Sequence, residues 1–198
     1  MKFHDIEQNS ETWEQIRLGK ITTSFFSDLL MKKETAGYKN LISRIAYERV
    51  TGERTEFYES QYMKRGHEIE PDAKEAYENL TFKEVLNGGF FELSDFVGGS
   101  PDGRVGKNGL TEFKCPAYNT MIEYLESQIV PKIYIPQLQG QLLVAGREWV
   151  DFMAFHPRLK RVIIRVFRDE ELIMRLNDEL EIAIEKINIL IPKIQLSN

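Results

Sequence analysis

The fold is decided by the stretch Gly99-Ser100-Pro101-Asp102-Gly103 and the nearby stretch Leu110-Thr111-Glu112-Phe113-Lys114-Cys115. On a strand, side chains alternate between the two faces, so Glu112 and Lys114 share one face and Phe113 occupies the other. Asp102 stands at the start of a turn, and an Asn-Gly turn at 107–109 leads the chain into the second stretch. We therefore expect a hairpin that brings Asp102 beside Glu112.

Two carboxylates this close repel each other strongly unless a cation lies between them. Mg²⁺ suits such a pair, because it takes oxygen ligands from one or two carboxylates and keeps several waters. A lysine on the same face is placed to orient an attacking water, and a metal stabilises charge that develops on a phosphate. The spacing of these residues predicts a metal-dependent site that acts on phosphate.

Outside these stretches, the apolar residues follow first a helical period and then a strand period. Short, mostly antiparallel strands are expected over 82–115, with a hairpin at Asn87-Gly88-Gly89. Two further strands precede an amphipathic final helix that is expected to end before Pro192. This order predicts an α/β sandwich with a mixed sheet. The expected helices are 24–33, 40–50 (ended by Gly52), 60–80, 118–127, 136–145 and 170–190, and the two later strands are 149–155 and 162–167.

The composition is that of an ordinary folded chain. Its 198 residues fit one domain spanning 1–198, and the single Cys115 excludes an internal disulfide and a four-cysteine zinc or iron–sulfur site. No apolar run reaches the roughly 20 residues that a membrane span needs, and the polar, acidic N-terminus shows no signal peptide. We therefore expect a cytoplasmic protein without a membrane partner. The formal net charge of -5 argues against nucleic-acid binding by the whole surface.

The order of the motifs resembles that of a nuclease family. Pro101-Asp102 followed by Glu112-Phe113-Lys114 resembles the PD-(D/E)xK motif. Further blocks resemble those of the lambda exonuclease and YqaJ-like viral recombinase family, in the same order and over nearly the whole chain. These blocks are 13–24 (W-x-x-x-R-x-G-x-I-T-x-S), 66–73 (G-x-x-x-E-x-x-A), 100–103 (S-P-D-G), 112–116 (E-x-K-C-P), 137–139 (Q-x-Q) and 157–161 (P-R-x-K-R).

The resemblance implies a restriction-endonuclease-like three-layer sandwich, with a central mixed β-sheet flanked by helices. It also implies a 5′→3′ exodeoxyribonuclease that digests one strand of linear double-stranded DNA to mononucleotides. The product is a 3′ overhang for phage-type recombination by single-strand annealing. Members of this family use Mg²⁺, or Mn²⁺ in its place, assemble as homotrimeric rings around DNA and work with a single-strand annealing protein.

The resemblance also assigns roles to residues around the metal. It implies that Asp102 and Glu112 ligate the metal, with the Phe113 carbonyl as a further ligand. Glu70 matches a helix carboxylate that completes the site or positions the attacking water. Lys114 matches the residue that assists this water. Gln137 matches a supporting glutamine, although position 141 is Gln where a related Q-x-x-x-Y pattern has Tyr.

A second group of residues is implied to bind the DNA. Arg17, Ser24 and Ser100 match a pocket for the terminal 5′-phosphate, and an arginine offers phosphate a planar bidentate fork. Met63 lies where the family places an apolar wedge. The basic residues of 158–168 form either a DNA-backbone contact strip or a solvated strand edge. These basic residues are Arg158, Lys160, Arg161, Arg165 and Arg168.

Two other functions stay open at this point. The first is another PD-(D/E)xK enzyme, such as a restriction-type endonuclease or a junction resolvase, which would cut DNA internally. The second is a non-catalytic DNA-binding recombination adaptor. The residues that match a 5′-phosphate pocket favour an exonuclease over the first alternative, and the intact carboxylates and lysine argue against the second.

Overall fold

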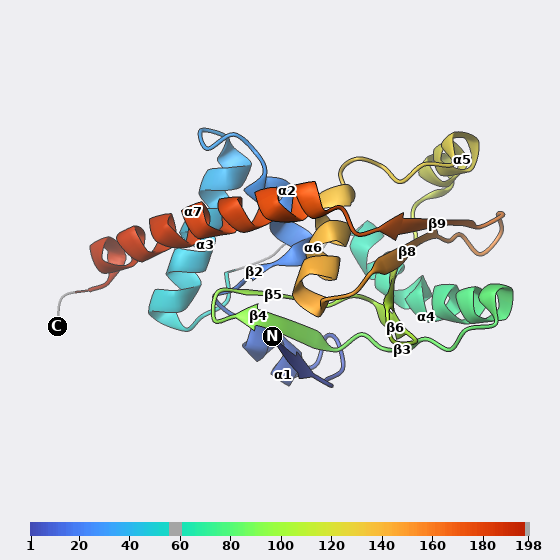
Figure 1. Cartoon of the computed structure of the whole chain (residues 1–198), viewed down its shortest axis with the longest axis horizontal. Helices are drawn as coiled ribbons and strands as arrows, with labels where there is room; N and C mark the ends of the chain where they lie inside the picture. Colours follow the sequence, from blue (N-terminus) through green and yellow to red (C-terminus); the bar gives the residue numbers. More distant parts are fainter. Residues whose placement is uncertain (56–60, 197–198) are drawn as a thin grey trace.

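The backbone of the computed structural model follows the predicted order of helices and strands (Figure 1). The structure describes residues 1–55 and 61–196, with the side chains of 61–63 outside the description. The helices are α1 (Glu11–Arg17), the 3-10 turn η1 (Thr23–Phe25), α2 (Phe26–Leu29), α3 (Ala36–Thr51), α4 (Gln61–Thr81), α5 (Tyr118–Ser127), α6 (Ile135–Ala145) and α7 (Glu170–Ile194).

The strand that carries Glu112 and Lys114 lies inside a mixed sheet, as predicted. This sheet has the order β3-β6-β7-β8-β9, with β3 (Leu86–Asn87), β6 (Gly103–Val105), β7 (Gly109–Lys114), β8 (Trp149–Ala154) and β9 (Val162–Phe167). β6 and β7 form the expected antiparallel hairpin, whereas β7 and β8 pair in parallel. The parallel pairing places the carboxyl ends of β7 and β8 side by side, with Lys114 opposite Ala154.

A second mixed sheet forms from the N-terminal and middle segments. Its order is β1-β4-β5-β2, with β1 (Lys2–His4), β4 (Phe90–Ser94), β5 (Val97–Gly99) and β2 (Ile21–Thr22). β2 and β5 pair in parallel, with Thr22 opposite Gly98. The segment that follows β2 therefore lies next to the end of β5, from which the chain continues towards Asp102.

Helices cover both faces of the sheet that contains β7, which gives the expected three layers. On one face, Leu138 and Leu142 of α6 share a buried cluster with Leu110 of β7. On the other face, Tyr77 of α4 shares a separate buried cluster with Phe113 of the same strand. Burying each apolar side chain of this size contributes about 1.5–3 kcal/mol to folding. The two cores hold β7 from both sides and so fix the direction of the side chains at its end.

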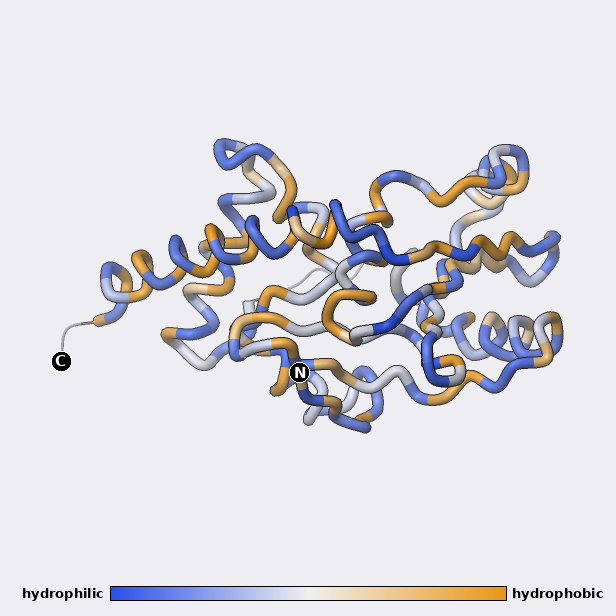
Figure 2. Tube along the Cα trace, viewed as in Figure 1, coloured by the Kyte–Doolittle hydropathy of each residue, from blue (hydrophilic) through white to orange (hydrophobic). Residues whose placement is uncertain are grey.

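The final helix α7 packs along α3, away from the β7 sheet (Figure 1). Its hydrophilic and hydrophobic residues alternate turn by turn (Figure 2), and Leu176, Leu180 and Ala183 are buried. This is the amphipathic pattern that the sequence predicts. None of the helices in the described part of the chain is long and apolar enough to cross a membrane.

The hairpin predicted at Asn87-Gly88-Gly89 is wrong. β3 and β4 belong to different sheets: β3 pairs with β6, while β4 pairs with β1 and β5. A Cβ on Gly88 would lie 1.8 Å from the Pro101 carbonyl oxygen, and Gly89 has a φ of +61°. The two glycines therefore let the chain cross from one sheet to the other while it passes tightly against the segment before Asp102.

Two predicted helix ends also differ from the structure. The helix expected over 24–33 begins as the 3-10 turn η1 and ends at Leu29. Thr35 Oγ1 donates to the Lys32 carbonyl and accepts from the Tyr38 N–H, so it caps the start of α3. The final helix continues through Pro192 to Ile194 instead of ending before it. Pro192 lacks an N–H, so the carbonyl four residues earlier loses its helical hydrogen-bond donor, and the helix ends two residues beyond the proline. By contrast, α5 and β9 have the predicted bounds, and Gly52 ends α3 with a φ of +70°.

Candidate active site

Glu112 is a buried carboxylate at the centre of the site, only 2% exposed. Its Oε1 accepts hydrogen bonds from Lys114 Nζ at 2.5 Å and from Gln137 Nε2 at 2.6 Å. Its Oε2 accepts a hydrogen bond from Gln141 Nε2, also at 2.6 Å. Both glutamines come from α6, one helical turn apart, so the helix that packs on this face of the sheet also holds the carboxylate in place.

Asp102 lies beside the strand of Glu112, as the predicted hairpin requires. Its Oδ2 accepts a hydrogen bond from the Phe113 N–H at 2.6 Å, and its own N–H donates to the Thr111 carbonyl at 3.1 Å. Burial raises the pKa of the Asp102 carboxyl well above its ordinary value, and the nearby charges of Glu112 and Glu70 raise it further. Asp102 is therefore a partly buried acid in a negatively charged surrounding.

Glu70 of α4 completes a group of three neighbouring carboxylates. Burial and the charge of Glu112 raise its pKa, while His67 and Lys114 oppose that rise. Glu70 and Asp102 both line a cavity of about 520 Å³, together with Phe113. Carboxylates that raise one another's pKa in this way are stabilised in their ionised form by a cation.

Lys114 brings the positive charge that faces these acids. Burial lowers the pKa of its ammonium group, but the charges of Glu112 and Asp102 outweigh burial, so the pKa is raised overall. The ammonium nitrogen also lies 5.1 Å from the centroid of the Tyr134 ring. Lys114 is therefore a protonated donor at the edge of the site, held by the Glu112 carboxylate and lying next to the Tyr134 ring.

The donor chemistry of this group fits a hard divalent cation. Asp102 and Glu112 supply carboxylate oxygens, and Phe113 can contribute only through its backbone, because its ring packs 6.0 Å from that of Tyr77 in the core. Among the described residues, no three or more Asp, Glu, His and Cys side chains are arranged to hold a metal by themselves. Such a set is not required, because Mg²⁺ binds through one or two carboxylates and keeps waters as its other ligands.

The residues predicted to bind a 5′-phosphate lie on neighbouring elements. Trp13 joins two of them: its Nε1 donates to Ser100 Oγ at 2.7 Å, and the Arg17 Cζ lies 3.8 Å from its ring centroid. Ser24 Oγ lies 3.1 Å from Thr22 Oγ1, which brings Ser24 close to the end of β5. Burial lowers the pKa of the Arg17 guanidinium to about 10, so it stays charged at neutral pH.

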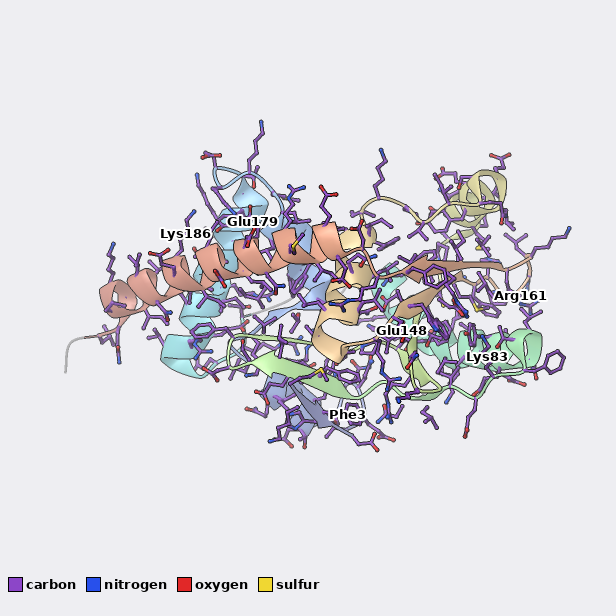
Figure 3. All side chains as sticks on the ribbon, viewed as in Figure 1. Phe3, Lys83, Glu148, Arg161, Glu179 and Lys186 are labelled. Carbon is purple, nitrogen blue, oxygen red and sulfur yellow. The ribbon has the colours of Figure 1, made fainter. Side chains whose placement is uncertain are left out.

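The basic stretch of 158–168 divides into two parts. Arg165 donates to both oxygens of the buried Asp151, each at 2.8 Å, and Arg168 donates to Glu170 and to a carbonyl of α6, so both are structural. The cations of the β8–β9 loop are exposed and form no ion pair with a described residue. These are Arg158, Lys160 and Arg161, and Figure 3 shows Arg161 at the tip of this loop.

Met63, the predicted wedge, lies outside the side chains that the structure describes. Three other features were missed at the sequence level. Gln141 contacts Glu112, and its four-residue spacing from Gln137 was the available signal. Trp13 bridges Arg17 and Ser100, which no local pattern reveals. The segment 7–9 lines the cavity next to Glu70, and Gln8 Nε2 donates to the Pro101 carbonyl at 2.8 Å.

Comparison with known proteins agrees with this geometry. Residues 12–148 match the YqaJ-like viral recombinase domain. The chain belongs to the YqaJ-like viral recombinase family. The matched range includes Asp102, Glu112 and Lys114, the residues at the centre of the candidate site. No curated protein matches the chain.

Solved structures extend the YqaJ-like match over most of the chain. An alkaline exonuclease (LHK-Exo) from Laribacter hongkongensis is 32% identical, with a TM-score of 0.86 over 93% of this chain and 95% of that one. The same enzyme in complex with dAMP is also 32% identical, with a TM-score of 0.87 over the same shares of the two chains. A phage-related exonuclease from Haemophilus somnus 129PT shares the fold at 16% identity, with a TM-score of 0.74 over 88% of this chain and 96% of that one. This YqaJ-like chain therefore has the nuclease fold of the alkaline exonucleases, which supports an exonuclease role in DNA recombination.

Proposed function

We propose that this chain is a Mg²⁺-dependent 5′→3′ exodeoxyribonuclease, with Mn²⁺ able to replace Mg²⁺. Its substrate is linear double-stranded DNA with a 5′-phosphate, of which it degrades one strand to mononucleotides and leaves a 3′ overhang for single-strand annealing. The observation that carries this proposal is the buried Glu112, held at both oxygens beside Asp102 and Lys114. The dAMP complex of the related LHK-Exo supports mononucleotides as ligands of such a site.

The chemistry follows from the positions of these side chains. Mg²⁺, when bound, would supply charge stabilisation at the phosphate and lower the pKa of a water. Asp102, Glu112 and the Phe113 carbonyl would hold it, and Glu70 would complete the site or position the attacking water. Gln137 and Gln141 fix the Glu112 carboxylate, so its oxygens do not need to reorganise during the reaction. Lys114 donates to the attacking water or to a phosphate oxygen.

The polarity of digestion would come from the group around Trp13. Arg17, Ser24 and Ser100 offer a cation and two hydroxyls to the terminal 5′-phosphate, and Ser100 is two residues before Asp102. Each cut creates a new 5′-phosphate that can enter the same place. The predicted homotrimer, the annealing partner, the cytoplasmic location and the single-domain organisation over 1–198 belong to this proposal by family resemblance. A mass measurement in solution tests the trimer.

The proposal is tested by comparing linear 5′-phosphorylated duplex with a relaxed circle of the same sequence. We expect Mg²⁺-dependent release of mononucleotides from the linear substrate alone, and loss of activity in EDTA. Glu112→Ala should lower the digestion rate by more than about a hundredfold. Loss of a residue that only hydrogen-bonds to a metal ligand already lowers metal affinity or activity about ten- to a hundredfold, and the loss of a ligand itself should cost more. The exposed Glu148 serves as the matched control, because it lies just before β8, at the end of the β7–β8 pair opposite to Lys114.

Three results would count against the exonuclease. Internal cutting of the circle indicates an endonuclease or junction resolvase instead. Binding of DNA without cleavage at any Mg²⁺ concentration indicates an adaptor. Full activity of Glu112→Ala would remove Glu112 from the reaction altogether.

A further inference from the structure

Two arginines near the proposed phosphate pocket are held in place without using their hydrogen-bond donors. The Arg17 Cζ lies 3.8 Å from the centroid of the Trp13 ring, and the Arg44 Cζ lies 3.7 Å from that of the Phe25 ring. Neither guanidinium donates a hydrogen bond to any residue that the structure describes. Stacking orients both groups. The Arg44 Nε is buried without a hydrogen-bond partner among the described residues, so it is the terminal N–H groups of the two guanidiniums that can reach an anion.

Other partly buried arginines of the chain behave differently. Arg49, on the same helix as Arg44, also stacks on a ring, with its Cζ 3.7 Å from the Phe96 centroid. It nevertheless donates to the Gly19 carbonyl at 3.1 Å and to Asp95. Arg165 and Arg168 likewise donate to protein oxygens. Stacking on a ring therefore does not by itself explain why Arg17 and Arg44 have no acceptor among the described residues.

Arg44 is placed over the same segment as the pocket residues. One turn further along α3, Glu48 Oε2 accepts a hydrogen bond from the Gly19 N–H at 3.0 Å, two residues beyond Arg17. The ring that Arg44 covers belongs to Phe25, the neighbour of Ser24. Arg44 Nε lies 3.6 Å from Glu48 Oε1, an ion pair without a hydrogen bond.

The charges of this group also favour an anionic ligand. Burial lowers the pKa of Arg17 most, and the positive charges of Arg54 and Arg44 lower it further. The negative charges of Glu14 and Glu48 raise it and so partly offset this effect. Arg54 already forms an ion pair with Glu14. A terminal phosphate monoester carries a charge close to -2 at neutral pH, because its second pKa is about 6. Two guanidinium forks match that charge better than they match a phosphodiester or a hydroxyl.

We propose that Arg44 is a second phosphate-binding residue, which together with Arg17 holds the terminal 5′-phosphate and selects it over a 5′-hydroxyl. The inference rests on the proposed function, because it requires that a 5′ DNA end enters this pocket. It adds a residue from α3 to a pocket otherwise built from α1, η1 and the segment after β5.

The test compares 5′-phosphorylated with 5′-hydroxyl linear duplex, both in binding without divalent cation and in digestion rate with Mg²⁺. Arg44→Lys keeps the charge but loses the bidentate fork. We expect it to reduce the preference for the phosphorylated end by about tenfold, the value of one charge-assisted hydrogen bond. Arg49→Lys, on the same helix and also stacked on a phenylalanine, should leave the preference unchanged.

The outcomes separate this inference from the function on which it rests. If the unaltered protein shows no preference for the phosphorylated end, the proposed 5′-end recognition fails, and Arg44 fails with it. If the unaltered protein shows that preference and the Arg44→Lys protein shows it equally, only the role proposed for Arg44 is overturned, and the proposed function stands. Arg44→Gln is a second variant in case the lysine variant does not fold, and a folded Arg44→Gln protein with full preference overturns the inference equally.

Discussion

At the scale of single residues, Glu112 is held by two amides of one helix, and Gln141 makes one of these contacts from a fully buried position. Gln141→Met removes this donor and keeps most of the side-chain volume. Without the donor, Glu112 Oε2 loses its hydrogen bond and the carboxylate is free to turn. We expect the Mg²⁺ concentration at half-maximal nuclease rate to rise about ten- to a hundredfold, as measured in a metal titration.

Gln139, on another face of the same helix, is the matched control. Its Nε2 donates to the Phe167 carbonyl at 2.8 Å, and its Oε1 accepts from the Asp169 N–H at 2.9 Å. Gln139→Met should therefore lower the free energy of unfolding by about 1–3 kcal/mol and leave the metal titration unchanged. Equal metal shifts in both variants would show that the Gln141 effect comes from stability alone.

The centre of the site was accessible from the sequence because it depends on local rules. Strand alternation places Glu112 and Lys114 on one face, and the turn at 107–109 returns the chain so that Asp102 lies beside them. Trp13 could not be found in this way, because its contact with Ser100 joins residues far apart in the chain. Such contacts depend on the parallel pairing of β2 with β5, and no short-range pattern encodes that pairing.

At the scale of elements, the Asn87-Gly88-Gly89 segment shows how one sequence signal serves two structures. Asn-Gly favours a tight turn, and both glycines do permit a sharp change of direction. The turn connects two sheets instead of two strands of one sheet, because β3 pairs with β6 whereas β4 pairs with β1. Local turn propensity does not determine which strands pair.

The close approach at Gly88 leads to a stability prediction. Gly88→Ala would place a Cβ 1.8 Å from the Pro101 carbonyl oxygen, so the segment before Asp102 must shift. We expect a loss of about 1–3 kcal/mol in the free energy of unfolding, measured by urea denaturation, together with a lower nuclease rate. Gly66→Ala is the control, because its Cβ meets nothing within 4 Å inside α4. That change should stabilise the protein by about 0.5–1 kcal/mol, and a loss of stability there would contradict the helical environment.

One buried hydrogen bond adds to the apolar contacts that attach α4 to the sheet. Tyr77 OH donates to Asp151 Oδ2 at 2.6 Å, and Arg165 binds the same carboxylate. Glu70 lies seven residues earlier in this helix, which places it on the same side as Tyr77. Tyr77→Phe should cost about 1.5–3 kcal/mol of unfolding free energy, as expected for a hydrogen bond to a charged group. It should also lower the nuclease rate through the displacement of Glu70.

Tyr118→Phe provides the comparison for this change. Tyr118 is 67% exposed at the start of α5, so the loss of its hydroxyl should alter stability by no more than about 0.5 kcal/mol. If Tyr77→Phe were equally harmless, Asp151 would be satisfied by Arg165 alone, and the proposed anchor of α4 would have no role.

At the scale of the whole molecule, the net charge of -5 describes an average and hides a local arrangement. Some of the negative charge belongs to the candidate metal site, where burial and the charge of Glu112 raise the pKa of Glu70 and of Asp102. Several cations are occupied by structural pairs, as Arg165 is with Asp151. The exposed cations of the β8–β9 loop lie at the same end of the sheet as Lys114, because β7 and β8 run in parallel. A DNA-binding surface is therefore compatible with an acidic chain.

This arrangement predicts which cations govern the salt dependence of DNA binding. Neutralising Arg158, Lys160 and Arg161 together should make the slope of log affinity against log salt shallower by up to about 3, because each phosphate that a cation neutralises adds roughly 0.9 to its steepness. The matched control neutralises Arg175, Lys186 and Lys193 of α7, which runs away from the β8–β9 tip, as the positions of Lys186 and Arg161 in Figure 3 illustrate. Titrations of a catalytically inactive Glu112→Ala background with linear duplex at several salt concentrations measure both slopes. The same decrease in both variants would mean that DNA responds to total charge, and the loop would then have no special place in binding.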